Sequence, residues 1–437
     1  MKKQKLLRWF FGILLLVVLT AMLYIYPQLK VLNGYAARTM CTCHFAIQRT
    51  EDQILKEDLG GGLFGMANLI VDPNHKRVSS TVFGLAKKTA IYKPGIGCIL
   101  LKNENDNDFE YRPPIDTFRQ SNPWVSAKSA SLSEAEIQSI HQLAFDKDFG
   151  CSDKKTRALL ILRNDSLIYE QYAMGTDANT PLLGWSMTKS VLSTLYGILS
   201  KEGKIKRDNR IFANHPDPNV RQTTIADLLQ MRAGMAWEEE YDQYSTATQM
   251  LFDTDDIYAM TASLPFEKRE WEYSSGTSNL LSGLIKKQFN SEKEYLDFPY
   301  KALFHALDLE NAWIETDEKG TMIASSYMYA TACDWLKLGM LYLKNGNYGG
   351  HQIIEKEWVD FVKTEAPGSE GRYGGHFWLN KNGVSYKDLP PDLYTMDGYQ
   401  GQLVAIFPTQ NMVVVRLGLS DLDFNQLLKQ VVDAVEN

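Results

Sequence analysis

The sequence predicts an α/β protein of the α+β class, in which one antiparallel sheet is built from both ends of the chain and is flanked by helices. Two strand-like runs, Ala158–Arg163 and Ser166–Tyr172, precede a long and mostly helical middle part. Strand-like runs return at Gln402–Phe407 and Met412–Leu417, and Phe424–Val435 has the pattern of a closing helix. Helices of the middle part should therefore pack beside the sheet and form a cleft with it.

Local signals mark the boundaries of these elements. Asn164 and Asp165 separate the first two strands and are typical of a two-residue hairpin turn. The segment Ser131–Lys147 reads as an amphipathic helix, with Ser131 and Glu134 as a possible capping box. Apolar residues at helical spacing follow Ser186, and Thr223–Arg232 has the pattern of a second helix.

The chain divides into three predicted parts. Residues 1–29 read as an anchor, residues 30–123 as a small β-containing region with a linker, and residues 124–437 as the main domain, with a helical subdomain at about 205–345. Strand-like runs in the second part are Ala67–Val71, Arg77–Phe83, Ile91–Tyr92 and Cys98–Leu101.

The N-terminus predicts export. Four basic residues within the first eight positions precede the uncharged apolar run Trp9–Tyr26. An uncleaved membrane helix with its basic end in the cytoplasm is the preferred interpretation, and a cleaved signal peptide is the alternative. Either way, the catalytic domain should be periplasmic or otherwise extracytoplasmic, held at the inner membrane by the anchor.

Composition excludes several classes of function. The net charge is −7 and no basic stripe follows the N-terminus, so nucleic-acid binding is not expected. The seven histidines form no His-Glu-x-x-His pattern, so we expect neither a zinc site nor any other metal or cofactor. The oligomeric state leaves no signal in the sequence.

Five cysteines are expected to lie in an oxidising compartment, where one disulfide is plausible. Cys98 should pair with Cys41 or Cys43, and the sequence does not decide between these two partners. Cys151 and Cys333 should stay unpaired.

Ser186 and Lys189 are the principal candidates for catalysis. They stand three positions apart at the start of the predicted helix, so the hydroxyl and the amine share one face. A serine nucleophile needs an adjacent base, and a buried lysine becomes one when desolvation disfavours its ammonium form. The same Ser-x-x-Lys spacing recurs at Ser152–Lys155, but no apolar helix follows it. The alternative is that Ser186 only caps the helix, with Lys189 solvated.

Two later segments complete the candidate site. Tyr273 and Ser275 stand before the helix that begins near Thr277, where a tyrosine could relay a proton or simply form a turn. In the segment Gly398–Gln402, glycines would let a substrate carbonyl approach the strand edge. The backbone N–H groups of Ser186 and Gln402 would then form an oxyanion hole.

The order Ser-x-x-Lys, Tyr-Ser-Ser and Gly-Tyr-x-Gly-Gln resembles the penicillin-recognising serine hydrolase superfamily, in the branch of class C β-lactamases, DD-peptidases, esterases and 6-aminohexanoate-dimer hydrolase. The resemblance covers about residues 130–437. It implies a DD-peptidase/β-lactamase-like fold, Ser186 as the acylated nucleophile, Lys189 as its base and Tyr273 as the proton relay. Candidate residues for substrate binding are Tyr241 on a mobile loop, Ser275, Tyr399, Gly401 and Trp378.

Two departures from the superfamily pattern bear on the substrate. Ser275 stands where β-lactamases and DD-peptidases carry an asparagine, and Tyr399 stands where they carry a lysine. The sequence therefore predicts an extracytoplasmic hydrolase of a small ester or linear amide. The alternatives are a true DD-peptidase or β-lactamase, and a catalytically silent penicillin-binding-like protein that binds the cell wall.

Overall fold

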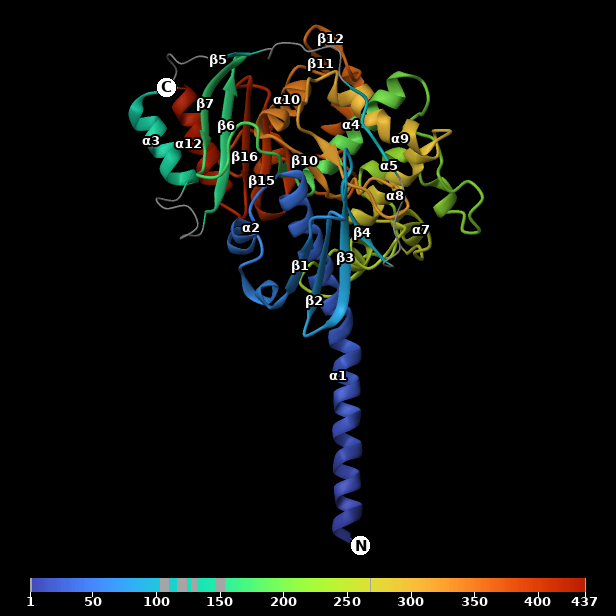
Figure 1. Cartoon of the computed structure of the whole chain (residues 1–437). Helices are drawn as coiled ribbons and strands as arrows, with labels where there is room; N and C mark the ends of the chain where they lie inside the picture. The colour runs from blue at the N-terminus through green and yellow to red at the C-terminus, as the bar shows by residue number, and fades with distance from the viewer. Residues whose placement is uncertain are drawn as a thin grey trace. The chain divides into compact units, whose positions relative to one another are not determined.

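Contacts between residues divide the molecule into two units (Figure 1). Unit 1 contains Met1–Phe109 and Glu238–Asp255, and unit 2 contains Glu110–Trp237 and Asp256–Asn437. This computed structural model describes residues 2–102, 110–115, 124–126, 132–145, 154–267 and 269–436. The predicted domain boundary at residue 123 therefore lies outside the described residues, as do Ser152 and Cys151.

Unit 1 is built around one long helix and a four-stranded antiparallel sheet of order β1-β2-β3-β4. The helix α1 packs against β2 and β3, and its buried residues begin near Leu32. The strands are β1 (Asn68–Asp72), β2 (Arg77–Val82), β3 (Leu85–Lys93) and β4 (Gly97–Leu101), and the helices are α1 (Lys2–Cys41), α2 (Glu51–Glu57) and α6 (Thr246–Phe252).

The N-terminal part of α1 carries exposed apolar side chains, among them Leu15, Leu16 and Leu23, ahead of the part that packs on the sheet of unit 1. In the part of the chain that the structure describes, no helix combines the length and the apolar character needed to span a membrane. The expected membrane anchor is thus not shown.

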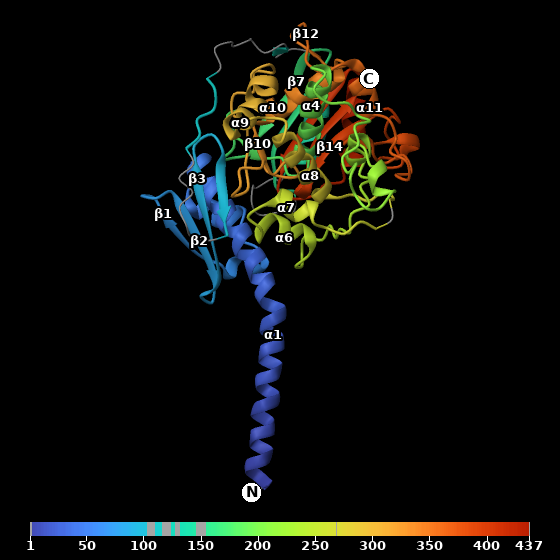
Figure 2. The same cartoon turned by 90° about the vertical axis from the view of Figure 1, so that its right-hand side faces the viewer.

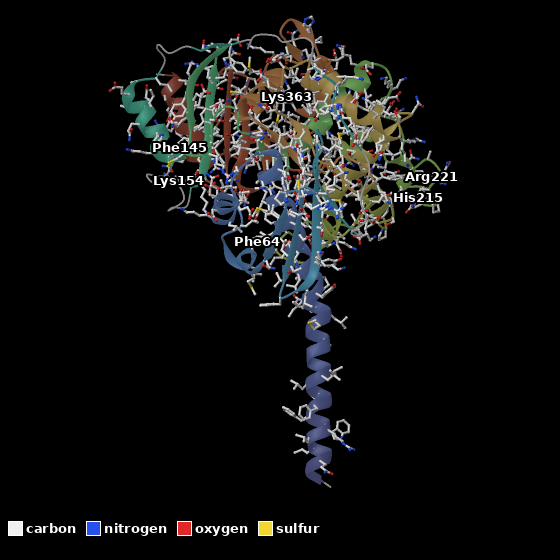
Figure 3. All side chains as sticks on the ribbon, in the orientation of Figure 1. Phe64, Phe145, Lys154, His215, Arg221 and Lys363 are labelled. Atoms are coloured by element: carbon white, nitrogen blue, oxygen red, sulfur yellow. A yellow bond between two sulfur atoms is a disulfide. The ribbon has the colours of Figure 1, made fainter. Side chains whose placement is uncertain are left out.

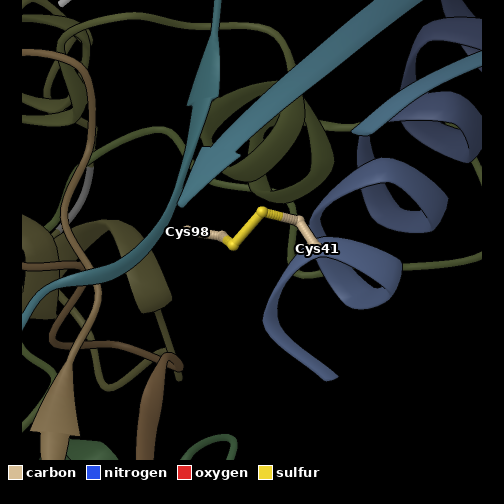
Figure 4. Close-up of a disulfide and its surroundings, with 2 residues drawn as sticks. All are labelled: Cys41 and Cys98. Carbon is tan, nitrogen blue, oxygen red and sulfur yellow. A yellow bond between two sulfur atoms is a disulfide. The ribbon is translucent and has the colours of Figure 1, made fainter. Parts of the chain in front are cut away.

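A disulfide joins the end of α1 to the start of β4 (Figure 4). Its cysteines are Cys41 and Cys98, so the prediction for Cys98 is confirmed and its partner is now assigned. Cys43 is buried outside this bond, and Cys333 is a free thiol, as predicted.

Unit 2 contains a seven-stranded sheet of order β13-β14-β15-β16-β6-β7-β5. All neighbouring strands are antiparallel except β5 and β7, which are parallel. Its central strands come from both ends of the domain, as predicted, because β16 pairs with β6. The strands are β5 (Val125–Ser126), β6 (Thr156–Arg163), β7 (Ser166–Tyr172), β13 (Trp378–Leu379), β14 (Tyr394–Gly398), β15 (Gln402–Phe407) and β16 (Met412–Gly418).

Helices cover both faces of this sheet (Figures 1 and 2). On one face, α3 (Glu134–Ala144) and α12 (Phe424–Glu436) pack together and share a core with β6, β15 and β16. On the other, α10 (Ala332–Leu343) packs on β6, β15 and β16, and α4 (Met187–Lys201) on β14 and β15. Packing on both faces holds the strands of the sheet in place.

The remaining elements lie between and beside these layers. A small sheet of order β8-β10-β9 borders the start of α4. Its strands are β8 (Leu182–Leu183), β9 (Trp313–Ile314) and β10 (Met328–Ala330). A separate pair is formed by β11 (Asn347–Tyr348) and β12 (His351–Gln352). The other helices are α5 (Ile225–Leu229), α7 (Ile257–Ala262), α8 (Ser275–Lys286), α9 (Glu292–Pro299) and α11 (Lys356–Val362).

Local predictions met mixed outcomes. The hairpin turn is confirmed, because Asn164 and Asp165 both adopt positive φ between β6 and β7. The capping box of α3 is formed by Ser133 and Glu136, two positions later than predicted, and Ser131 itself lies outside the described residues. The predicted helix Thr223–Arg232 is shorter in the structure, where α5 spans Ile225–Leu229.

Candidate active site

Ser186 is the N-cap residue of α4, so it lies at the positive end of the helix dipole. The preceding residue, Trp185, has a φ of +46°, which is strained for a residue with a large side chain. The Thr188 hydroxyl donates to the Trp185 carbonyl at 2.7 Å and accepts from the Met328 N–H at 3.1 Å. These bonds fix the turn that presents Ser186, whose side chain is partly exposed while α4 behind it is buried.

Lys189 is buried beneath Ser186, with 1% of its surface exposed. Its Nζ lies 2.9 Å from Ser186 Oγ, 3.0 Å from Ser275 Oγ and 2.8 Å from the Ser325 carbonyl oxygen. The carbonyl can only accept, so one N–H of the lysine is committed to it. If a second N–H goes to Ser275, a neutral amine keeps its lone pair for the Ser186 hydroxyl. The geometry therefore fits a base next to a nucleophile, and it disfavours the alternative of a solvated lysine.

The groups around the lysine are themselves held in place by α8. Asn279 stands one helical turn beyond Ser275; its Oδ1 accepts from the Ser325 N–H at 3.0 Å, and its Nδ2 donates to Ser325 Oγ at 3.1 Å. This clamp orients the Ser325 carbonyl toward Lys189. Buried groups held this way keep one geometry, because a broken bond would leave an unsatisfied polar atom.

The aromatic ring of Tyr273 lies beside Lys189. Lys189 Nζ is 5.0 Å from the centroid of the Tyr273 ring, within the range of a cation–π contact. Trp378 stacks on the same ring with centroids 5.3 Å apart, and Tyr373 meets it edge-on at 5.8 Å. Tyr273 and Trp378 are both partly exposed, so they are placed to contact a substrate as well as the lysine.

The strand entry at Gly398–Gln402 approaches the segment before Ser186. A Cβ on Gly398 would meet the Gly184 carbonyl oxygen at 2.2 Å, so this close approach requires glycine. The Tyr399 ring is 57% exposed and lies edge-on to the Trp185 ring at 5.6 Å. Tyr399 therefore stands next to the residue that precedes the candidate nucleophile.

Arg416 holds the turn that leads into Gln402. Its buried guanidinium donates to the carbonyls of Gln400 and Gly401 at 3.1 and 2.8 Å. The Gln402 side chain donates to the Gly418 carbonyl and accepts from the Gly418 N–H at 3.0 Å. Gly401 has a φ of +72°, and a Cβ there would meet Arg416 Nη1 at 2.6 Å. The turn is thus rigid, as an oxyanion donor at Gln402 would require.

A buried histidine joins the helices that carry the site. His376 Nδ1 lies 2.7 Å from the Leu229 carbonyl, so that nitrogen carries the proton, and Nε2 accepts from the Ser278 hydroxyl at 3.0 Å. Ser190, on α4, donates to the His376 carbonyl at 2.7 Å. Burial lowers the pKa of His376 to about 3.

Most of the predicted site residues meet in unit 2. Ser186, Lys189, Tyr273 and Ser275 form one continuous set of contacts, although Ser275 is buried against the lysine. Tyr241 lies in unit 1, where its hydroxyl donates to Glu239 at 2.5 Å, so its contact with substrate stays a prediction.

Sequence reasoning missed three residues of this set: Asn279, Ser325 and His376. Asn279 follows Ser275 by four positions on one helix, a spacing that could have indicated it. The other two come from distant segments and leave no local signal.

Comparison with known proteins decides the family. Residues 153–421, more than half of the chain, match the Beta-lactamase family. The chain belongs to the Beta-lactamase family. It is therefore a serine hydrolase, and the predicted resemblance to the penicillin-recognising superfamily is confirmed.

Relatives within this superfamily place the chain more closely. It is 23% identical over 304 residues to a 6-aminohexanoate-dimer hydrolase of Paenarthrobacter ureafaciens, covering 60% of this chain and 72% of the relative. A solved structure of a putative 6-aminohexanoate-dimer hydrolase from Bacillus anthracis matches with a TM-score of 0.55 at 20% identity, over 64% of this chain and 79% of that one.

A third match is EstCE1, described as a hydrolase with promiscuous acyltransferase activity. It has a TM-score of 0.52 at 15% identity, over 69% of this chain and 98% of that chain. At these identities the two solved structures show the shared fold alone.

Proposed function

We propose that this member of the Beta-lactamase family cleaves a small ester or linear amide through an acyl-enzyme on Ser186. The observation that carries the proposal is the 2.9 Å contact between Ser186 Oγ and the buried Nζ of Lys189. A nucleophile and base within hydrogen-bond reach, with the base oriented by further groups, is the general pattern of covalent catalysis by serine. Ser275 and the Ser325 carbonyl supply that orientation.

In the proposed reaction, Lys189 takes the proton of Ser186 as Oγ attacks the substrate carbonyl. The N–H groups of Ser186 and Gln402 stabilise the oxyanion, and the leaving group departs with a proton relayed through Tyr273. The relayed proton is the one that Lys189 took from Ser186, so the lysine is neutral again after acylation. Water then attacks the acyl carbon and gives a proton to Lys189, which passes it to Ser186 Oγ as the acid is released. Each water consumed therefore yields one acid and one alcohol or amine.

The substrate class follows from the wall of the site. Tyr399 and Trp378 offer uncharged aromatic surface to a substrate. The Ser275 hydroxyl is already hydrogen-bonded to Lys189. A β-lactam carboxylate would find no lysine at position 399, and such a lost contact to a charged group costs roughly 1.5–3 kcal/mol. A neutral acyl group loses nothing. The named activity of the Paenarthrobacter relative, a hydrolase of an amide-linked dimer, supports the linear amide as the second substrate to test.

A substrate panel tests this proposal. Short-chain nitrophenyl esters and a linear anilide should be turned over with higher kcat/KM than a chromogenic cephalosporin, and Ser186→Ala should abolish all of it. A cephalosporin that outperforms every ester would favour the β-lactamase or DD-peptidase alternative. Complete inactivity of a folded wild-type chain toward all three classes would favour the silent cell-wall-binding protein.

We also propose that unit 2 acts outside the cytoplasm, with the apolar run of α1 holding the chain at the inner membrane. The disulfide between Cys41 and Cys98 supports an oxidising compartment. The uncharged residues 9–26, preceded by basic residues, support anchoring with the N-terminus inside. Tagging the two ends and probing protease access in intact spheroplasts tests the orientation: the C-terminal tag should be digested from outside.

A further inference from the structure

Two turns of unit 1 expose large apolar side chains that the catalytic reaction does not use. Phe83 stands at the turn between β2 and β3 and is 80% exposed. Leu63 is 68% exposed in the short 3₁₀ turn Gly62–Met66, and Met66 and Leu85 are exposed as well. We call Leu63, Met66, Phe83 and Leu85 the apolar collar. Exposed apolar residues that gather in one place mark an interaction surface.

Contacts with α1 place both turns at one level of that helix. Asn33 Nδ2 donates to the carbonyls of Leu85 and Ala86 at 3.2 and 2.9 Å. Phe64, labelled in Figure 3, packs its ring on that of Tyr35 with centroids 4.7 Å apart. Asn33 and Tyr35 are two residues apart, so both turns contact the same helical turn of α1.

About two helical turns before this level, α1 emerges from the packed part of unit 1. Residues 27–30 are half-buried, residues 22–26 are exposed, and the side chains before them include Leu14, Leu15 and Leu16, also exposed. Figures 1 and 2 both show the β2–β3 turn at the end of the sheet from which the helix projects. The apolar collar therefore lies near the exposed apolar run of α1.

Charges near the collar are already paired. Asp253 accepts from Lys30 of α1 at 3.0 Å and from Lys88 of β3 at 2.7 Å. Both lysines are thus part of an ion-pair network within unit 1. Burying the neighbouring apolar side chains would thus not strand a charge in a medium of low polarity.

We propose that the apolar collar rests in the interfacial region of a lipid bilayer, at the base of the anchoring helix. The proposal rests on the anchoring by α1 proposed above, and it adds a second contact with the lipid. Apolar side chains of interfacial segments enter a bilayer by about 5–10 Å, which Phe83 and Leu63 can do at their turns without bending the sheet. Unit 1 then contacts the bilayer through both α1 and the collar.

Depth measurement on the full-length chain tests the collar. Single cysteines at Phe83→Cys and Leu63→Cys are placed in a Cys151→Ser, Cys333→Ser background and labelled with a small fluorophore. His75→Cys, in the turn at the opposite end of β2, is the matched control, since six residues of strand separate the two turns by about 20 Å. The protein is reconstituted in vesicles of phosphatidylcholine and phosphatidylglycerol that carry a lipid-attached nitroxide quencher.

We expect the collar labels to be quenched by the lipid-attached nitroxide about threefold or more strongly than the His75→Cys label, as interfacial insertion requires. Equal quenching at both ends of β2 in vesicles that float with the protein overturns the collar alone. Labels shielded from both the nitroxide and aqueous iodide indicate that a second protein covers them, which also overturns it. A chain that fails to float with vesicles overturns the anchoring and the collar together. Ester hydrolysis by each labelled variant verifies its fold.

Discussion

At the scale of single residues, the site depends on how Lys189 is held. Three groups surround its Nζ, and each comes from a different segment of unit 2. Ser275 is the one that separates this chain from the asparagine-bearing enzymes it resembles. Its buried hydroxyl contacts Lys189 directly, so we expect Ser275 to orient the base rather than to bind the substrate.

Ser275→Ala should lower kcat while leaving KM nearly unchanged. Removing the hydroxyl frees one N–H of Lys189 and loosens the lone pair aimed at Ser186, a loss we expect to cost about ten- to a hundredfold in rate. Steady-state kinetics with a nitrophenyl ester measures it.

The matched control is Ser193→Ala, which removes another buried hydroxyl of unit 2, bonded to the Gly375 carbonyl at 2.9 Å and not to the lysine. If both variants lose the same activity, or if Ser275→Ala changes KM alone, the role assigned to Ser275 is wrong.

At the scale of elements, α4 and α8 carry the reactive groups, and His376 ties them together. One nitrogen of its ring binds the end of α5, the other binds Ser278 on α8, and its carbonyl binds Ser190 on α4. The ring is held neutral, because charging it would bury an imidazolium that has no carboxylate among its hydrogen-bond partners in the described part of the chain.

The pKa of His376, lowered to about 3, predicts a pH dependence of stability. Below the ordinary histidine pKa of about 6.5, the unfolded chain binds a proton that the folded chain does not. The folded state should therefore lose stability as pH falls from about 6.5 toward 3, by up to about 1.4 kcal/mol per pH unit from this group.

Urea unfolding of unit 2 at several pH values measures the slope, and His376→Gln should make it shallower even if that variant is less stable throughout. If His376→Gln keeps the wild-type slope of unfolding free energy against pH, the slope comes from other groups and the prediction is wrong.

The sequence predicted the elements whose signals are local. Apolar runs and a turn pair located β6 and β7, and apolar spacing located α4 and α12. The sequence did not predict β14 (Tyr394–Gly398), because pairing with neighbouring strands, and not a local pattern, makes this segment a strand. Likewise Ser186 and Lys189 share one helix and were found, whereas Ser325 and His376 reach the site through tertiary packing that no local pattern records.

At the scale of the whole molecule, unit 1 is stabilised by a covalent bond that closes a long loop. Cys41 and Cys98 are 57 residues apart, and between them lie α2 and strands β1 to β3. Removing this disulfide should lower the stability of unit 1 by about 2–4 kcal/mol, through the entropy regained by its unfolded chain.

Hydrogen exchange followed by mass spectrometry measures that loss segment by segment. In Cys41→Ser, Cys98→Ser protein, amides of β3 and β4 should exchange faster, whereas β15 and β16 of unit 2 should not change. Cys333→Ser is the control for thiol removal as such. Unchanged protection of β3 and β4 would mean that packing against α1 alone stabilises the sheet.

The central claim is that Ser186 is the acylated nucleophile and Lys189 its base. Mass spectrometry of the full-length chain after treatment with a fluorophosphonate tests it most directly. We predict one adduct, located on Ser186, absent from Ser186→Ala and formed at a small fraction of the wild-type rate in Lys189→Arg, since a guanidinium stays protonated. An adduct on another serine, or one that forms in Ser186→Ala at the wild-type rate, would contradict the account.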